Sequence, residues 1–189
     1  MKKIAVFASG HGSNARKICE YFSSNPHIQV VLIGTNKSDA GVLNHAKDFN
    51  IPTITFDKKK MWEQNFIKEN LMPFGIDLIV LAGFLLLIPP SWVEHYPQRI
   101  INIHPALLPK FGGKGLFGSH VHNAVKASGD AETGITIHYV NAHYDEGEPI
   151  LQVKCSVFPQ DTPEQIASRV LKLEHFYFPR TIEKILLSN

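Results

Sequence analysis

The apolar positions of the chain follow two periods, which alternate along the first hundred residues. Short apolar runs predict strands at residues 3–8, 28–34, 53–56, 77–82 and 99–103. Between these runs, the pattern predicts helices at residues 14–23, 40–50, 60–72 and 89–96. Three side chains at helical spacing in the third helix are expected in the core, namely Trp62, Phe66 and Leu71. Alternating strands and helices are typical of a doubly wound, parallel sheet.

The second half of the chain has a different pattern. Residues 104–119 contain several prolines and glycines and predict a long loop. A helix at residues 120–128, strands at residues 134–140 and 150–157, and a final helix ending near Leu187 are expected to follow. Thr162 and Gln165 match a capping box, and Pro163 suits a first helical turn. The pattern therefore predicts one α/β domain over residues 1–189, with a mostly parallel sheet and an antiparallel addition near the C-terminus.

Composition and charge exclude several classes of protein. A formal net charge of +2 over 189 residues is too small to indicate nucleic-acid binding. No stretch approaches the ~18 apolar residues that a membrane span requires, and the apolar run that begins at Ile4 is too short for a signal peptide. Cys19 and Cys155 lie far apart and outside any CxxC pattern. We therefore expect free thiols and a cytoplasmic protein.

The first loop has the features of an anion-binding site. Gly10 and Gly12 follow the first strand, and the next helix presents unpaired N–H groups with the positive end of its dipole. Phosphate is the natural ligand of such a loop. A tight turn with Ser13 or Asn14 as a helix cap is the alternative. The loop lacks the third glycine of a dinucleotide fingerprint and the GK[ST] of a Walker loop, which disfavours a dinucleotide enzyme.

A second group of polar residues follows the fifth predicted strand. Asn102 and His104 are two residues apart, so both side chains point to one face at the carboxyl end of that strand. An amide and an imidazole side by side can stabilise an oxyanion and move protons, as acyl or formyl transfer requires. Asp145 lies in a later turn and would assist His104 if that turn folds back over the strand. The alternatives are a polar pair that satisfies a loop and an ordinary acidic turn.

The histidines give no metal-binding pattern. The chain has ten of them, but His120 and His122 are only two residues apart and no HExxH or paired Cys/His spacing is present. We therefore expect a metal-free site. His138, between apolar neighbours in a strand, is interpreted as a structural histidine.

Several motifs together resemble the folate-dependent formyltransferases. They are the runs at residues 102–109 (Asn-Ile-His-Pro-Ala-Leu-Leu-Pro), 133–140, 145–147 and 150–152. The Ser-Gly-His-Gly-Ser-Asn segment at residues 9–14 narrows the resemblance to the phosphoribosylglycinamide formyltransferases, the branch that acts on glycinamide ribonucleotide in de novo purine synthesis. The resemblance extends to Glu174 and His175 in the last helix. It implies a single catalytic domain with a Rossmann-like formyltransferase fold.

The resemblance also implies roles for individual residues. The formyl group of 10-formyltetrahydrofolate, the co-substrate, would pass to the amine of glycinamide ribonucleotide. His104 would be the general acid, Asn102 would stabilise the oxyanion, and Asp145 would assist proton transfer. The residues implied to bind the ribonucleotide are Gly12, Ser13, Asn14, Glu174 and Lys59, the last within a basic run that otherwise forms a solvated loop. The residues implied to bind the folate are Asn102, Leu85, Leu86, Leu87, Ile88, Asn141, Ala142, His143 and Tyr144.

Two departures from the family pattern are visible. The loop at residues 110–118 is a few residues longer than usual and rich in glycine, and Leu86 stands where some members carry arginine. Two rival functions remain at this point. Formyltransferases that act on methionyl-tRNA or on sugar nucleotides usually carry a further domain, whereas this chain stops at Asn189. A non-catalytic ligand-binding module is disfavoured by the intact Asn102, His104 and Asp145. We expect small-molecule partners only, and a monomer or weak homodimer.

Overall fold

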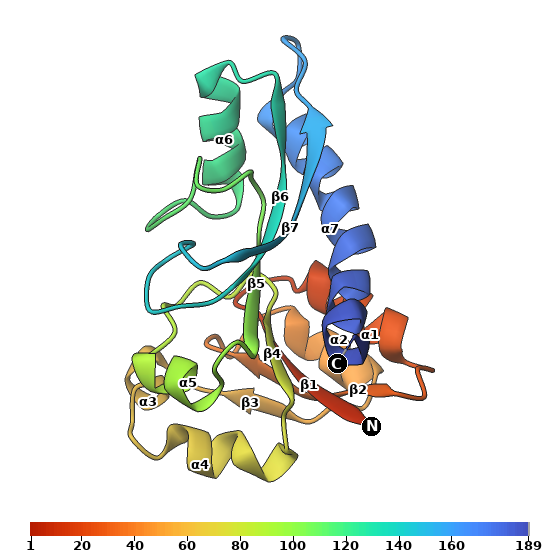
Figure 1. Cartoon of the computed structure of the whole chain (residues 1–189), viewed down its shortest axis with the longest axis vertical. Coiled ribbons are helices and arrows are strands. Elements are labelled where there is room, and N and C mark those ends of the chain that lie inside the picture. The colour runs from red at the N-terminus through yellow and green to blue at the C-terminus, as the bar shows by residue number, and fades with distance from the viewer. Residues whose placement is uncertain (189) are drawn as a thin grey trace.

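The computed structural model describes residues 1–188 as one seven-stranded sheet flanked by helices (Figure 1). Its strand order is β3-β2-β1-β4-β5-β6-β7. The first five strands are parallel, and β6 and β7 are added antiparallel at one edge. The strands are β1 (Lys2–Phe7), β2 (Ile28–Thr35), β3 (Thr53–Thr55), β4 (Leu78–Leu81), β5 (Ile100–His104), β6 (Glu132–Tyr139) and β7 (Pro149–Ser156). The predicted fold class, including the antiparallel addition, is confirmed.

Helices cover both faces of the sheet, and β1 shows why. Its alternate side chains belong to two separate clusters, with Ile4 and Val6 on one face and Ala5 and Phe7 on the other. The first cluster includes residues of α1 (Ser13–Phe22), α2 (Val42–Asp48), α6 (Ser119–Ser128) and α7 (Pro163–Leu187). The second includes residues of α3 (Lys58–Met61), α4 (Phe66–Asn70) and α5 (Pro90–His95). A strand buried on both faces is therefore apolar at nearly every position.

The prediction of one continuous helix at residues 60–72 is wrong. The structure breaks it into α3, α4 and a 3₁₀ turn, η1 (Met72–Phe74). The Asp57 side chain caps α3 by accepting a hydrogen bond from the Lys60 N–H (2.7 Å), so the helix begins earlier than predicted. The break after Met61 rotates Trp62 off the buried face, and this side chain is 48% exposed rather than in the core. Phe66 and Leu71 are buried, as predicted.

The last helix follows its sequence signals. The Thr162 hydroxyl accepts from the Gln165 N–H (3.3 Å), and the Gln165 side chain accepts from the Thr162 N–H (2.8 Å), which confirms the capping box. The helix continues through Pro179 to Leu187 and packs against α1, α6 and β6. None of the helices within residues 1–188 combines the length and hydrophobicity needed to cross a bilayer.

Candidate active site

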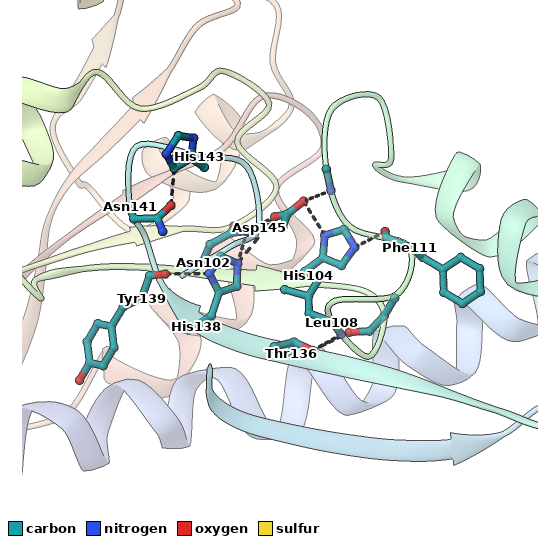
Figure 2. A network of polar contacts seen from close by, with 12 residues as sticks. Asn102, His104, Leu108, Phe111, Thr136, His138, Tyr139, Asn141, His143 and Asp145 are labelled. Carbon is teal, nitrogen blue, oxygen red and sulfur yellow. Dashed lines mark hydrogen bonds and ion pairs between the residues drawn. The ribbon is translucent and has the colours of Figure 1, made fainter. Parts of the chain in front are cut away.

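The carboxyl end of β5 brings Asn102 and His104 to one carboxylate. The Asp145 Oδ1 lies 3.4 Å from the Asn102 Nδ2, and its Oδ2 lies 3.5 Å from the His104 Nδ1 (Figure 2). His104 is buried, and the Asp145 side chain is only 12% exposed. The contact expected between the acidic turn and the fifth strand is therefore present.

The turn between β6 and β7 places this carboxylate. Because β6 runs antiparallel to β5, the segment after Tyr139 returns over the carboxyl end of β5. Asp145 adopts a left-handed backbone conformation with φ 56°, which is uncommon for a residue with a side chain. A Cβ at Gly147 would lie 1.6 Å from the Tyr139 carbonyl oxygen, so only glycine fits there. The turn is held in one path by close packing of its own backbone.

His138, interpreted above as a structural histidine, also contacts the residues of this cluster, a contact that the sequence did not predict. Its Nδ1 donates to the Tyr139 carbonyl (2.8 Å), which leaves the Nε2 of the neutral ring to accept from the Asn102 Nδ2 (3.1 Å). The same Nε2 lies 3.7 Å from the Asp145 Oδ1. The β5–β6 register places His138 directly opposite Asn102. A polar residue at that position, between apolar neighbours, was the available signal, but its partner is known only once the strand pairing is known.

Both ring nitrogens of His104 face polar groups. Its Nε2 donates to the Phe111 carbonyl (2.8 Å), so the Nδ1 is the nitrogen that faces Asp145. Burial lowers the pKa of His104, and the charge of Asp145 and the bond to Phe111 oppose this only in part. The neutral ring is therefore favoured in the free protein, and Asp145 is the group that favours its protonation.

Asp145 is ionised in these surroundings. Burial alone would raise its pKa, but the neighbouring His138 and His104 rings and the Gly113 N–H (3.0 Å from the Oδ2) outweigh burial and lower the pKa. A buried carboxylate with several donors is thus available beside an imidazole, which is a proton-transfer arrangement.

A main cavity of about 720 Å³ opens beside this cluster. Its walls come from the carboxyl ends of β4 and β5, residues 113–119, and one face of α7. Glu174 of α7 lies on the wall and is buried, and the Asn14 Nδ2 donates to it (2.6 Å). Burial raises the pKa of Glu174 to about 7. His122 of α6 also lines this cavity, buried and with its Nδ1 lacking a partner within residues 1–188.

The first loop is arranged differently from the alternative cap considered above. Gly12, with φ 73°, occupies the N-cap position of α1, and no side chain caps the helix. A Cβ on Gly12 would lie 2.7 Å from the Val42 side chain, so this glycine is required by the fold. Ser13 is exposed, and Asn14 is the member of the predicted trio that lines the main cavity.

A second cavity of about 60 Å³ is lined by three members of this cluster, Asn102, His138 and Asp145. Seven residues expected to bind folate line it, namely Leu86, Leu87, Ile88, Asn102, Asn141, His143 and Tyr144. Leu85 lines the main cavity instead, and Ala142 lines neither. Lys59 lies exposed on α3 and also lines neither cavity.

The two cavities meet at shared residues. Phe84, Asn102, Tyr144 and Asp145 line both. The arrangement can therefore present two ligands, one on each side, to the same amide and carboxylate. Residues 1–188 contain no group of three or more histidine, cysteine or acidic side chains arranged to hold a metal ion.

Comparisons with known proteins place the chain in a family. The model of a family described as formyl transferase matches residues 2–182. A chloroplastic phosphoribosylglycinamide formyltransferase of Arabidopsis thaliana is 45% identical over 97% of this chain and 65% of its own length, and one of Escherichia coli is 37% identical over 95% and 84%. A solved phosphoribosylglycinamide formyltransferase from Anaplasma phagocytophilum superposes with a TM-score of 0.89 at 32% identity, covering 98% of this chain and 86% of that one. The chain spans less than two thirds of the length of the plant relatives, at 65% and 61%.

Proposed function

The chain belongs to the formyl transferase family, and from this premise we propose that it transfers the formyl group of 10-formyltetrahydrofolate to the amine of glycinamide ribonucleotide, a step of de novo purine biosynthesis. The observation that carries the proposal is the meeting of two cavities at Asn102 and Asp145, beside His104. Direct transfer between two substrates needs this arrangement, because donor and acceptor must contact the same proton-transfer groups.

The proposed chemistry follows from the positions of these groups. The neutral amine of the ribonucleotide attacks the formyl carbon, a C–N bond forms, and negative charge develops on the formyl oxygen. Asn102 and protonated His104 stabilise this charge, an effect worth ~3–4 kcal/mol for a well-placed donor. The bond from the formyl carbon to the folate nitrogen then breaks. One proton leaves the attacking nitrogen and one reaches the departing nitrogen, with Asp145 and His104 as the relay.

The charge of Asp145 supports its proposed part in this relay. Burial lowers the pKa of His104 and works against the protonated form that the oxyanion requires. Asp145, at 3.5 Å from the Nδ1, is the opposing charge. His138 supports the arrangement indirectly, since it fixes the Asn102 amide by accepting one of its N–H groups.

The proposed binding sites divide between the cavities. The uncapped N–H groups at the start of α1, with Gly12, Ser13 and Asn14, would receive the phosphate, and Glu174 would hold the sugar or glycinamide part. The folate would occupy the second cavity and its rim, against residues 85–88 and 141–144. Lys59 would contribute only a distant charge, because it lies outside both cavities.

The setting is proposed on more general grounds. Cys19 and Cys155 are free thiols, which suits a reducing compartment such as the cytoplasm. A monomer or weak homodimer is proposed as the working state.

A double-mutant cycle on turnover tests the catalytic assignment. Formyl transfer is followed by ultraviolet absorbance of the folate, with and without glycinamide ribonucleotide. We expect His104→Ala and Asp145→Asn each to lower turnover about a hundredfold or more, with ligand binding largely kept. The two losses should be non-additive, because the residues act as one unit.

Three results would contradict this proposal. Fully additive losses, or normal turnover in Asp145→Asn, would confine Asp145 to its turn. Transfer to an amino-sugar nucleotide but not to glycinamide ribonucleotide would assign the chain to a different branch of the family.

A further inference from the structure

We infer that the ammonium group of Lys114 binds the phosphate of the ribonucleotide substrate, as a second contact beyond the start of α1. This inference rests on the proposed function and names a residue that specifies the phosphorylated acceptor. Lys114 lies in the glycine-rich loop at residues 110–118 and lines the main cavity.

The first observation in favour of this contact is the charge of the residues that line the main cavity. Among the described residues that line it, Lys114 is the one lysine or arginine, whereas Asp145 and Glu174 supply two carboxyl groups. A phosphate monoester carries about −1.5 to −2 charges at pH 7. Such a ligand entering beside a buried carboxylate requires a compensating cation, because Coulomb repulsion is weakly screened away from bulk water.

The two lysines of the loop are used differently. The Lys110 ammonium pairs with Asp130 (2.5 Å) and lies 5.6 Å from the centre of the Phe111 ring. The Lys114 ammonium has no ion pair or hydrogen bond to any group in residues 1–188, and its side chain is exposed. The structure therefore leaves one loop lysine available for a ligand.

The backbone fixes the residue that precedes Lys114. The Gly113 N–H donates to the Asp145 Oδ2 (3.0 Å), which anchors the preceding residue to the catalytic carboxylate. Gly113 and Gly115 have φ values of 101° and 90°, and a Cβ on either would meet open space. These glycines are therefore needed for the path of the chain and not for close packing. This path carries the lysine, with its flexible four-carbon stem, along the cavity wall.

The position of Lys114 also indicates which anion it binds, the phosphate of the ribonucleotide or a carboxylate of the folate. Its cavity contains Asn14 and Glu174, which lie near the start of α1. Most residues expected to bind the folate line the other cavity, from which Lys114 is absent. The phosphate of the ribonucleotide is therefore its partner, and not a carboxylate of the folate.

The test compares Lys114→Met with Lys114→Arg and with the control Lys110→Met. Each variant is assayed with glycinamide ribonucleotide and with the same acceptor lacking its phosphate. We expect Lys114→Met to raise the KM for the ribonucleotide about tenfold or more, with the KM for the folate and kcat changed less than twofold. Lys114→Arg should recover most of the affinity, and Lys110→Met should match the wild type. The dephosphorylated acceptor should react equally with wild type and Lys114→Met.

Several outcomes would overturn the inference. An unchanged KM for the ribonucleotide, a raised KM for the folate alone, or equal losses with both acceptors would each remove the phosphate contact. A wild-type protein that transfers no formyl group would reject the proposed function instead. Calorimetric titration of the ribonucleotide into wild type and Lys114→Met decides the contact even then, and thermal melting confirms that each variant is folded.

Discussion

At the scale of single residues, Glu174 carries a buried carboxyl group whose hydrogen-bond partner within residues 1–188 is the Asn14 amide. Burial raises its pKa from 4.5 to about 7, so the folded protein holds this proton at a pH where the unfolded chain has released it. Below about pH 4.5 the carboxyl is neutral in both the folded and the unfolded state, and its contribution to stability is fully present. This contribution is lost as the pH rises from about 4.5 through 7, because the unfolded chain ionises freely and the folded protein must ionise a buried group.

Replacement of the Glu174 carboxyl by an amide tests whether the free energy of unfolding falls as the pH rises. Relative to Glu174→Gln, the free energy of unfolding of the wild type should fall by up to about 3 kcal/mol between pH 5 and pH 8, since each pKa unit corresponds to about 1.4 kcal/mol. Urea denaturation at both pH values measures it. Glu69→Gln, the same chemical change at an exposed position, is the control and should keep the wild-type slope. Parallel pH profiles for wild type and Glu174→Gln would show that this carboxyl ionises normally.

The sequence predicted the two polar residues of β5 more readily than the residues that contact them. Asn102 and His104 were predicted together because a two-residue spacing in a strand fixes a shared face. Asp145 was proposed from its acidic turn, with an ordinary turn as the alternative, and the resemblance implied its role. The contact of His138 with Asn102 was missed because it depends on an antiparallel pairing that spacing does not reveal. The contact between Asn14 and Glu174 joins residues 160 positions apart and was equally out of reach.

At the scale of elements, the turn between β6 and β7 depends on Gly147. An added Cβ would lie 1.6 Å from the Tyr139 carbonyl oxygen and 3.4 Å from the His138 Nδ1, so the turn that carries Asp145 must move. We expect Gly147→Ala to lower the melting temperature by several degrees and to lower turnover at least tenfold, because misplaced catalytic groups lose rate steeply. Melting curves and steady-state rates measure the two effects.

A matched control separates the general cost of replacing a glycine from the effect of moving Asp145. Gly129 caps the C-terminus of α6 with φ 72°, and a Cβ there would meet open space. Gly129→Ala should therefore cost about 1 kcal/mol of stability without changing turnover. If both variants lose turnover in proportion to their stability, the position of Asp145 does not depend on Gly147.

Local sequence signals predicted the helices and strands, with one exception. The strands and the last helix were predicted because apolar runs and a capping box act over a few residues. The helix at residues 60–72 failed because its apolar spacing continues across a break that the Asp57 cap and a turn after Met61 impose. Which face Trp62 presents depends on that break, and the 3.6-residue period cannot report it.

At the scale of the whole molecule, two cavities meet at the carboxyl end of β5. The main cavity opens between β5 and α7, and the second lies against residues 86–88 and the turn after β6. They share Asn102 and Asp145, so a ligand in each cavity would reach the same amide and carboxylate. The arrangement favours direct transfer in a ternary complex over storage of the formyl group on the protein.

The cysteines support the same conclusion. Cys19 is buried in the core, and burial raises the pKa of its thiol to about 12. Cys155 lies on β7, and neither cysteine lines either of these two cavities. A thiol ester of the formyl group is thus disfavoured at either position, and each substrate must be present for the other to react.

Initial rates at varied concentrations of both substrates should give intersecting double-reciprocal lines. Enzyme in excess over formyl folate should release no stoichiometric burst of folate product until the acceptor is added. The Cys19→Ala and Cys155→Ala variants should keep turnover within about twofold, because neither thiol touches a substrate region. Parallel lines, or a burst without acceptor that disappears in either variant, would mean that the two cavities work in sequence through a covalent intermediate.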